Sequence, residues 1–375
     1  MIYLDNAATS FPKPAESTAA MCAAMRNCAG YGRSSHAAAV YSAEIVYNCR
    51  QELAELFGAA SPNHVAFALN ATMALNEAIH ALVPRGSRVC ISGYEHNSVV
   101  RPLIERKCIL DTVRPRNDLE LIDVWKLHIQ RHPACVIVNH GSNVFGYLQP
   151  IEQIGGLCAQ YGIPLIVDAS QSAGAVDLKI SGIPNCAALC MAGHKGLQGP
   201  QGTGIMVLSE LLSRRALISG GTGSLSVMME QPREIPDVFE SGTLNIPGIA
   251  GLLESVRLAK KDKMVEVLEH ERFLRERLAE HIASIPGLRI VERPWKYGKL
   301  AVLSAVTERC SCDILGEALS EKGVFVRTGL HCAPLAHKTE RTAESGTIRF
   351  SMGRNNTVQE IDAAADILCS IMNTF

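Results

Sequence analysis

The run Ile163-Pro164-Leu165-Ile166-Val167-Asp168 indicates the fold class, because an unbroken apolar series here ends on a carboxylate. Continuous apolar runs of this length are typical of parallel strands that are buried on both faces of a sheet. A second such run lies at Cys135–Asn139, and a helical segment, residues 151–161, lies between the two and ends at Gly162. Repeating units of this kind imply a mostly parallel α/β sheet that is covered by helices on both faces.

The same alternation extends from about residue 45 to residue 210, and the character of the chain changes after about residue 250. Expected strands in the first part are 64–69, 88–92, 135–139, 163–167 and 203–208, and expected helices are 45–57, 72–82 and 151–161. The second part contains a charge-rich helical stretch at 254–284, a strand at 300–306, a helix at 312–322 and a final helix that opens with the capping-box pattern of Thr357 and Glu360. The sequence therefore predicts a large α/β domain, residues 14–252, and a smaller α+β domain formed by residues 1–13 and 253–375.

The composition argues against several classes of protein. Hydrophobic residues make up 47 % of the 375 residues and charged residues 19 %, as in ordinary globular enzymes. The formal net charge of −1 gives no reason to expect nucleic-acid binding. Since the chain has neither a signal-like start nor an apolar run of about 18 residues, we expect no membrane span and a cytoplasmic location. Thirteen scattered cysteines are expected to be reduced, and no cysteine or histidine spacing predicts a metal site.

Two residues at expected strand ends suggest a specific chemistry. Lys195 lies in the run Ala192-Gly193-His194-Lys195-Gly196, twenty-seven residues after Asp168. A lysine that is partly removed from water can condense with an aldehyde, and a carboxylate at a strand end can keep a pyridine nitrogen protonated. These are the two groups that pyridoxal phosphate (PLP) most needs from a protein. Each residue alone is more simply a surface lysine or a helix-capping aspartate, so the pairing carries the hypothesis.

Further polar groups follow other strand ends and are expected at the same edge of the sheet. The loop at Ala71 and Thr72 opens a helix, whose free N–H groups can bind phosphate, although Thr72 could equally be an ordinary helix cap. His96 could stack on an aromatic ring or be a hydrogen-bonded loop histidine. Asn143 and Gln171 offer amides to a ring oxygen or to a substrate.

Seven runs, in order along nearly the whole chain, resemble those of the cysteine desulfurases and selenocysteine lyases, which belong to the class-V aminotransferase group of fold type I PLP enzymes. The runs are Tyr3-Leu4-Asp5-Asn6-Ala7-Ala8-Thr9-Ser10, Glu95-His96, Ser142-Asn143-Val144, Val167-Asp168-Ala169-Ser170-Gln171-Ser172, Gly193-His194-Lys195, Glu240-Ser241-Gly242-Thr243-Leu244-Asn245 and Val326-Arg327-Thr328-Gly329-Leu330-His331-Cys332. The resemblance implies a large domain with a seven-stranded type of sheet, a smaller C-terminal domain, and a homodimer.

The resemblance also implies a role for each candidate residue. Lys195 would carry PLP and move protons, Asp168 would pair with the ring nitrogen, and His96 would stack on the ring. Asn143 and Gln171 would contact the ring oxygen and the substrate. The phosphate would be held by Ala71, Thr72 and His194, with Thr243 reaching it from the partner subunit. Arg349 and Arg327 would hold the carboxylate of the substrate.

Cys332 decides the reaction that the resemblance implies. Its thiolate would attack the sulfur of L-cysteine, giving L-alanine and a persulfide that passes to a separate acceptor protein. Arg327 and His331 are expected to supply positive charge that favours the thiolate. Among thirteen cysteines a core position is the simpler interpretation of any one, but the glycine and arginine neighbours favour an exposed, shaped loop.

Three alternatives stay open at this point. They are a selenocysteine lyase that uses the same site, a class-V aminotransferase or C–S lyase without persulfide chemistry, and a silent scaffold. Ala192 stands where the family often has a serine, and the segment Ala333-Pro334-Leu335-Ala336-His337-Lys338-Thr339 departs from the usual continuation. These departures, together with the short chain, indicate a divergent subfamily.

Overall fold

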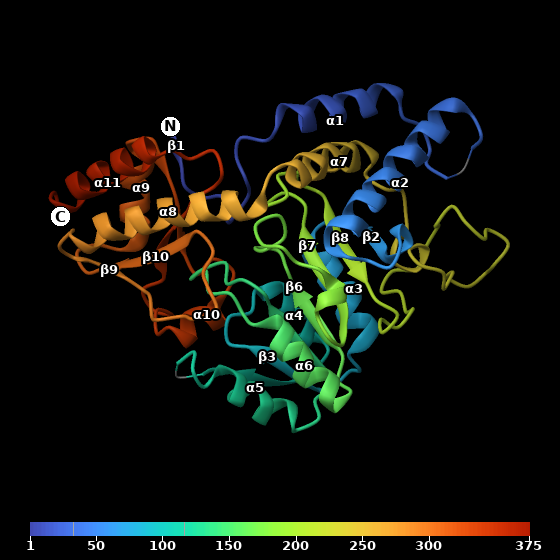
Figure 1. The fold of residues 1–375 in the computed structure, drawn as a ribbon, viewed down its shortest axis with the longest axis horizontal. Helices are drawn as coiled ribbons and strands as arrows, with labels where there is room; N and C mark the ends of the chain where they lie inside the picture. Colours follow the sequence, from blue (N-terminus) through green and yellow to red (C-terminus); the bar gives the residue numbers. More distant parts are fainter. Residues whose placement is uncertain (33, 116) are drawn as a thin grey trace.

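The computed structural model describes residues 1–32, 34–115 and 117–375. Within these residues, seven strands form a mostly parallel sheet in the order β2-β8-β7-β6-β5-β3-β4, with β8 antiparallel to both of its neighbours (Figure 1). The strands are β2 (Val65–Ala68), β3 (Arg88–Ser92), β4 (Ile109–Val113), β5 (Cys135–Asn139), β6 (Leu165–Asp168), β7 (Cys186–Ala192) and β8 (Gly204–Leu208). The predicted α/β class with a mostly parallel sheet is confirmed.

Helices cover both faces of this sheet. They are α1 (Ala15–Asn27), α2 (Ala37–Phe57), α3 (Ala71–Leu82), α4 (Asn97–Glu105), α5 (Leu121–Ile129), α6 (Ile151–Tyr161) and α7 (Ile246–Lys261). Successive strand residues point to opposite faces, so Val136 and Val138 of β5 join the apolar core with α2, α5, α6 and α7. Ile137 joins a second core with α3 and α4 on the other face. Burial on both faces explains why the strand sequences are continuously apolar.

A smaller antiparallel sheet lies in the C-terminal region, in the order β12-β13-β10-β9. Its strands are β9 (Leu288–Ile290), β10 (Val302–Thr307), β12 (Arg327–Gly329) and β13 (Thr347–Ser351), and the helices are α8 (Met264–Ala283), α9 (Cys312–Glu321), α10 (Pro334–Thr339) and α11 (Val358–Met372). At the N-terminus, β1 (Ile2–Tyr3) pairs with β11 (Val324–Phe325), and Leu4 is buried in the core of this region. Short 3-10 turns complete the chain at Pro62–His64, Ile180–Gly182 and Asp237–Phe239.

The division of the chain at residue 252 stays a prediction. Leu253 and Val256 of α7 belong to the core of the large sheet, whereas Leu274 and Leu278 of α8 belong to the core of the small one. We therefore propose that the large domain continues to the α7–α8 junction at residues 262 and 263.

The observed elements differ from the predicted ones at α7–α8 and at β7, and they agree at the cap of α11. The single helix expected at 254–284 is two helices, α7 and α8, which are separated at Asp262 and Lys263. Strand β7 was not expected because its sequence, Cys-Ala-Ala-Leu-Cys-Met-Ala, lacks the β-branched and aromatic residues that mark strands. The predicted capping box is confirmed: Thr357 Oγ1 accepts from the N–H of Glu360, and Glu360 Oε2 accepts from the N–H of Thr357.

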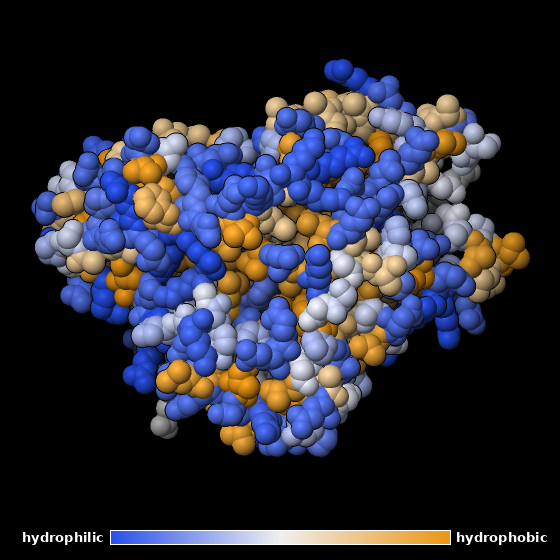
Figure 2. Space-filling view, viewed as in Figure 1, coloured by the Kyte–Doolittle hydropathy of each residue, from blue (hydrophilic) through white to orange (hydrophobic). Residues whose placement is uncertain are grey.

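Among the described helices, none is both long enough and apolar enough to cross a bilayer. Figure 2 shows a face on which hydrophilic side chains predominate, with apolar side chains scattered between them and at the right-hand edge.

Candidate active site

A pocket lies at the carboxyl ends of the parallel strands, where ligands bind in open α/β sheets. Strands β5, β6 and β7 end at Asn139, Asp168 and Ala192, and all three residues line the pocket. Eight of the candidate residues lie together on its wall, and these are Ala71, Thr72, His96, Asn143, Asp168, Gln171, His194 and Lys195. Segments that are far apart in the sequence meet here because parallel strands bring their ends to one edge.

Lys195 follows β7 and projects into this pocket. Burial lowers the pKa of Lys195 to about 8, and the negative charge of Asp168 opposes part of that shift. The lowered pKa makes a neutral, nucleophilic amine accessible near neutral pH, as a lysine that condenses with an aldehyde requires.

Asp168 is the last residue of β6 and is 6 % exposed. Its Oδ1 accepts a hydrogen bond from the N–H of Ser170 at 2.9 Å, which fixes the carboxylate at the strand end. Asn139 of β5 is its neighbour in register across the sheet. The carboxylate therefore lines the pocket with a defined orientation.

His96 caps the N-terminus of α4, and this capping fixes its protonation. Its Nδ1 accepts from the N–H of Ser98 at 3.1 Å, so the ring proton of the neutral imidazole is on Nε2. Burial lowers the pKa of His96; the charge of Asp168 opposes this shift, and the charges of Lys195 and Arg327 add to it. The Ser98 hydroxyl lies 2.9 Å from Nδ1 of His96 and 2.7 Å from Oγ1 of Thr72. Ser98 thus connects two candidate residues, and no sequence pattern had indicated it.

The N-terminus of α3 forms one end of the pocket. Ala71 and Thr72 occupy its first turn, where free N–H groups and the helix dipole favour an anion. His194 lies nearby, and its Nδ1 is 3.0 Å from Oγ1 of Thr9. Burial lowers the pKa of His194 to about 4, so its ring is neutral at physiological pH. This end of the pocket suits a phosphate bound through hydrogen bonds.

The two candidate amides already have partners in the protein. Asn143 Nδ2 donates to the carbonyl of His331 at 2.8 Å, and Gln171 Nε2 donates to the carbonyl of Ala7 at 3.0 Å. The Oδ1 atom of Asn143 is buried and has no hydrogen-bond partner among the residues described. Because a buried polar atom without a partner is costly, this oxygen is available to accept a hydrogen bond from a bound donor.

Arg349 and Arg327 face each other as neighbours in register on strands β13 and β12. Two like charges at such positions repel each other. Asp5 offsets this repulsion with an ion pair of 2.6 Å to Nη2 of Arg349. Nη1 of Arg349 donates to the carbonyl of Asn143 at 2.9 Å. Asp5 belongs to the first of the seven family-like runs, but no local signal linked it to Arg349.

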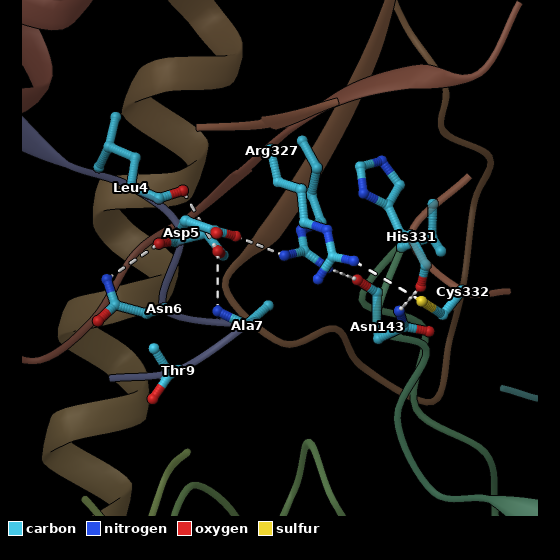
Figure 3. A network of polar contacts seen from close by, with 12 residues as sticks. Leu4, Asp5, Asn6, Ala7, Thr9, Asn143, Arg327, His331 and Cys332 are labelled. Atoms are coloured by element: carbon cyan, nitrogen blue, oxygen red, sulfur yellow. Dashed lines mark hydrogen bonds and ion pairs between the residues drawn. The ribbon is translucent and has the colours of Figure 1, made fainter. Parts of the chain in front are cut away.

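Cys332 is exposed in the loop between β12 and α10. Its φ is +56° and that of His331 is +48°, so two consecutive non-glycine residues occupy the left-handed region. Two hydrogen bonds hold this backbone: Asn97 N–H donates to the carbonyl of Cys332 at 2.8 Å, and Asn143 Nδ2 donates to that of His331. Arg327 Nη2 donates to the sulfur at 3.7 Å (Figure 3). The loop is therefore attached to the wall of the pocket.

The expectation that His331 supplies positive charge to this thiol is wrong. The ring of His331 is buried, lies 3.0 Å from Oγ1 of Thr347 through Nε2, and stacks on His337. Burial lowers the pKa of His331 far below its ordinary value, so the ring is neutral. Arg327 is the cation that contacts the sulfur.

Thr243 does not line the pocket of its own chain. It is exposed and lines a separate hollow with Phe67, Met73 and Gly202, among other residues. Its expected role toward the phosphate would require a second subunit.

The residues of the pocket fit PLP. The pocket combines a lysine with a lowered pKa, a carboxylate fixed at a strand end, a neutral imidazole and a helix N-terminus. The unpartnered Oδ1 of Asn143 adds an acceptor for a substrate donor. Bound there, PLP would supply an electron sink for reactions at the substrate carbon atoms.

Comparison with known proteins agrees with this geometry. The family model described as aminotransferase class-V matches residues 2–364. A probable cysteine desulfurase of Aeropyrum pernix is 30 % identical, with 100 % of this chain and 95 % of the relative covered. One from Pyrococcus abyssi is 28 % identical, with 98 % and 93 % covered. For one from Mycolicibacterium paratuberculosis, 29 % identical, the match covers 96 % of this chain and 54 % of the relative.

Solved structures share the fold. The apo structure of a cysteine desulfurase from Thermococcus onnurineus superposes with a TM-score of 0.89 at 24 % identity, covering 100 % of this chain and 95 % of that one. A cysteine desulfurase from Escherichia coli, with an S-sulfonic acid, gives 0.86 at 21 % identity with the same coverage. This likeness confirms the expected fold type I architecture, and the class-V aminotransferase match confirms PLP as the expected cofactor. On its sequence, its fold and its pocket, the chain belongs to the class-V aminotransferase family.

Proposed function

We propose that this protein is a PLP-dependent cysteine desulfurase that releases L-alanine and retains the sulfur as a persulfide on Cys332. One observation carries the proposal: an exposed thiol, in contact with an arginine, lies in a loop that is hydrogen-bonded to the wall of the cofactor pocket. In the overall step the C–S bond of cysteine breaks, an S–S bond forms on Cys332, and the β carbon gains the proton of the thiol. No external oxidant or reductant is needed.

Binding of cysteine would depend on the paired arginines. Arg349 is 1 % exposed and offers a planar fork of donors that matches a carboxylate, and Arg327 adds charge from the adjacent strand. The substrate carboxylate would compete with Asp5 for Arg349. Oδ1 of Asn143 is the nearby acceptor for the substrate ammonium group.

The groups of the pocket would divide the proton chemistry. Lys195 would take and return protons, since its lowered pKa brings both protonation states within reach near neutral pH. His96, neutral with its proton on Nε2, would lie against the ring and donate a hydrogen bond from that atom. Asp168 would keep the ring nitrogen protonated.

The position of Cys332 suits a nucleophile that reacts first with the substrate and then with an acceptor. Its exposure leaves the persulfide accessible to a separate acceptor protein. Nη2 of Arg327 lies 3.7 Å from the sulfur and would pair with the thiolate, which is the nucleophilic form of a cysteine. The thirteen cysteines are all free, which agrees with a reducing compartment such as the cytoplasm.

We also propose that the active form is a homodimer. Thr243 lies outside the pocket of its own chain. It belongs to the long connection between β8 and α7, which projects at the right of Figure 1 and also carries the exposed apolar residues Val227, Met228 and Met229. Exposed apolar segments of this kind mark protein contacts, and a second copy of the chain would both cover the loop and bring Thr243 to a phosphate.

The persulfide proposal is tested by Cys332→Ser, with Cys22→Ser as the control because Cys22 is also exposed but lies on α1. We expect the Cys332 variant to bind cofactor and cysteine normally and to release no alanine. Mass spectrometry of the wild type after cysteine should show added sulfur on the Cys332 peptide only. Wild-type alanine production by the Cys332 variant would refute the proposal.

The dimer is tested by sedimentation of the wild type and of Thr243→Ala. We expect the wild type to sediment as a dimer, and the variant to remain a dimer but bind PLP more weakly. A monomer that is saturated with PLP and active at high dilution would contradict the proposal.

A further inference from the structure

Glu95 is a fully buried carboxyl group directly beneath the cofactor pocket. It lies between the end of β3 at Ser92 and the cap of α4 at His96, and it is 0 % exposed. None of the proposed catalytic or binding roles uses it. Among the described residues Glu95 has no ion pair with an arginine or lysine, and a buried acidic side chain of this kind requires a physical explanation.

The position of Glu95 follows from the end of strand β3. Beyond Ser92 the chain turns at Gly93, so the N–H of Asn139 on neighbouring β5 has no strand partner there. Oε1 of Glu95 accepts this N–H at 2.8 Å. The same oxygen lies 2.6 Å from Oγ of Ser92. Glu95 therefore continues the hydrogen-bond ladder to the level of the pocket.

The orientation of Asn139 limits where protons can lie. Its Nδ2 donates to the carbonyl of Tyr94 at 2.9 Å, so Oδ1 points to Ser92 Oγ, at 2.8 Å, and can only accept. The N–H of Tyr94 donates to the same Ser92 oxygen at 3.1 Å. The Ser92 hydroxyl thus lies against two acceptor oxygens, of Glu95 and of Asn139, and has a single proton to give.

An ionised Glu95 would leave one of these two close oxygen–oxygen contacts without a proton. A protonated Glu95 satisfies both, because its O–H donates to Ser92 and the Ser92 O–H donates to Asn139. Oε2 of Glu95 is buried without a partner among the described residues. A neutral carbonyl oxygen tolerates such a site far better than a charged carboxylate oxygen does.

We propose that Glu95 is held as a neutral carboxylic acid beneath the pocket, so that Asp168 alone carries the negative charge offered to the cofactor nitrogen. Asp168 is the register neighbour of Asn139 on β6, and its charge disfavours ionisation of Glu95. The chain of Glu95, Ser92 and Asn139 assigns the proton to Glu95. Glu95 is thus a positioning residue, which acts through Asn139 and Asp168.

The electrostatic surroundings agree with this assignment. The pKa of Glu95 is raised to about 8, chiefly by burial; the hydrogen bonds from Ser92 and Asn139 oppose this shift, and the charge of Asp168 adds to it. Asp168 on β6 is the charged group that acts on Glu95. The residues that contact Glu95 on β3 and β5, Ser92 and Asn139, are neutral. The acid is expected to stay protonated at pH 7.

Infrared difference spectroscopy of the PLP-loaded protein tests the proposal. The spectrum of the wild type minus that of Glu95→Gln should contain the C=O stretch of a protonated carboxylic acid at pH 7, and this band should shift in deuterium oxide and disappear well above pH 8. An ionised carboxylate signal at pH 7 in its place would overturn the proposal.

Two substitutions of Glu95 test whether the protein requires a neutral side chain at this position or only a side chain of this length. Gln keeps the side chain neutral, and its Oε1 can still accept the N–H of Asn139, although it gives no proton to Ser92. Glu95→Gln should therefore retain turnover and PLP affinity within about threefold. Glu95→Asp, which shortens the side chain and breaks the chain of hydrogen bonds, should weaken PLP binding. Loss of PLP binding in Glu95→Gln but not in Glu95→Asp would show that the negative charge of Glu95 is required, and would refute the assignment.

Discussion

Asp168 and Lys195 lie at the ends of buried strands, whereas Cys332 lies in an exposed loop whose backbone is in the left-handed region. The first site is rigid because the sheet is buried on both faces and fixes where each strand ends. The second site is held by two hydrogen bonds, from Asn97 and Asn143, to a backbone that would not adopt this conformation by itself.

This difference corresponds to two tasks. A cofactor site needs groups that stay in place through each turnover, and strand ends provide this. A sulfur carrier must approach the substrate and afterwards meet another protein, which requires exposure and some freedom of the loop. We therefore expect substitutions at the two sites to have different effects. Variants of the pocket should affect PLP chemistry, and variants of the loop should affect sulfur transfer only.

Asp168→Asn should have the largest effect on turnover. The amide cannot stabilise a protonated ring nitrogen, so we expect kcat to fall by about 10²- to 10³-fold. Alkylation of Cys332 by a thiol reagent should proceed at the wild-type rate. Asp177→Asn, an exposed aspartate nearby in sequence, is the control and should be unaffected. Near-normal turnover of the Asp168 variant would make that residue structural.

Arg349→Lys should have the second-largest effect. Lysine keeps the charge but loses the fork of donors that binds both oxygens of a carboxylate. Each charged hydrogen bond contributes about 1.5–3 kcal/mol to binding, so loss of one should raise KM for cysteine about 10- to 100-fold. The measurement is steady-state kinetics with kcat and KM separated. Arg327→Lys, at the register neighbour, should raise KM less, because Arg327 is more exposed and is expected to contribute charge more than geometry. An equal or larger change in the Arg327 variant would reverse the assignment.

The pH dependence of PLP uptake should show the state of Lys195. The pKa of its amine is lowered to about 8, so the neutral form that reacts with the aldehyde predominates above pH 8 and is lost as the pH falls below it. The rate of covalent attachment to apo-protein should therefore fall about tenfold per pH unit below 8. Lys13, whose pKa burial also lowers to about 8, provides the control. If Lys13→Gln moved the profile, the titrating group would not be Lys195.

Gly329→Ala should have the smallest effect and should act on the loop alone. Gly329 has φ +91° with no atom within 4 Å of an added Cβ, so the cost is backbone strain of about 1 kcal/mol rather than a clash. We expect alanine release to fall about fivefold with PLP binding unchanged. Gly156→Ala, in open space on α6, should match the wild type. Weaker PLP binding in the Gly329 variant would mean that the two sites are not separable.

Much of the pocket could be predicted from the sequence, because its residues follow recognisable strands. Asp168 and Asn143 come after continuous apolar runs, and parallel strands bring such positions to one edge. The cap of α11 at Thr357 was also predictable, because both of its hydrogen bonds join residues three positions apart in the sequence. Where the local signal was weak, as in the alanine- and cysteine-rich β7, the strand was missed.

What the sequence by itself determined is therefore the sheet, the edge where the strand ends meet, and the chemical types of the groups placed there. Only the tertiary structure decided how those groups are paired. Asp5 reaches Arg349 across 344 residues of sequence, His331 turns into the core and away from its expected role, and Glu95 accepts a hydrogen bond from the N–H of Asn139. The physical reason is range: apolar periodicity and helix caps act between near neighbours, whereas burial and ion pairing depend on which distant segments come into contact.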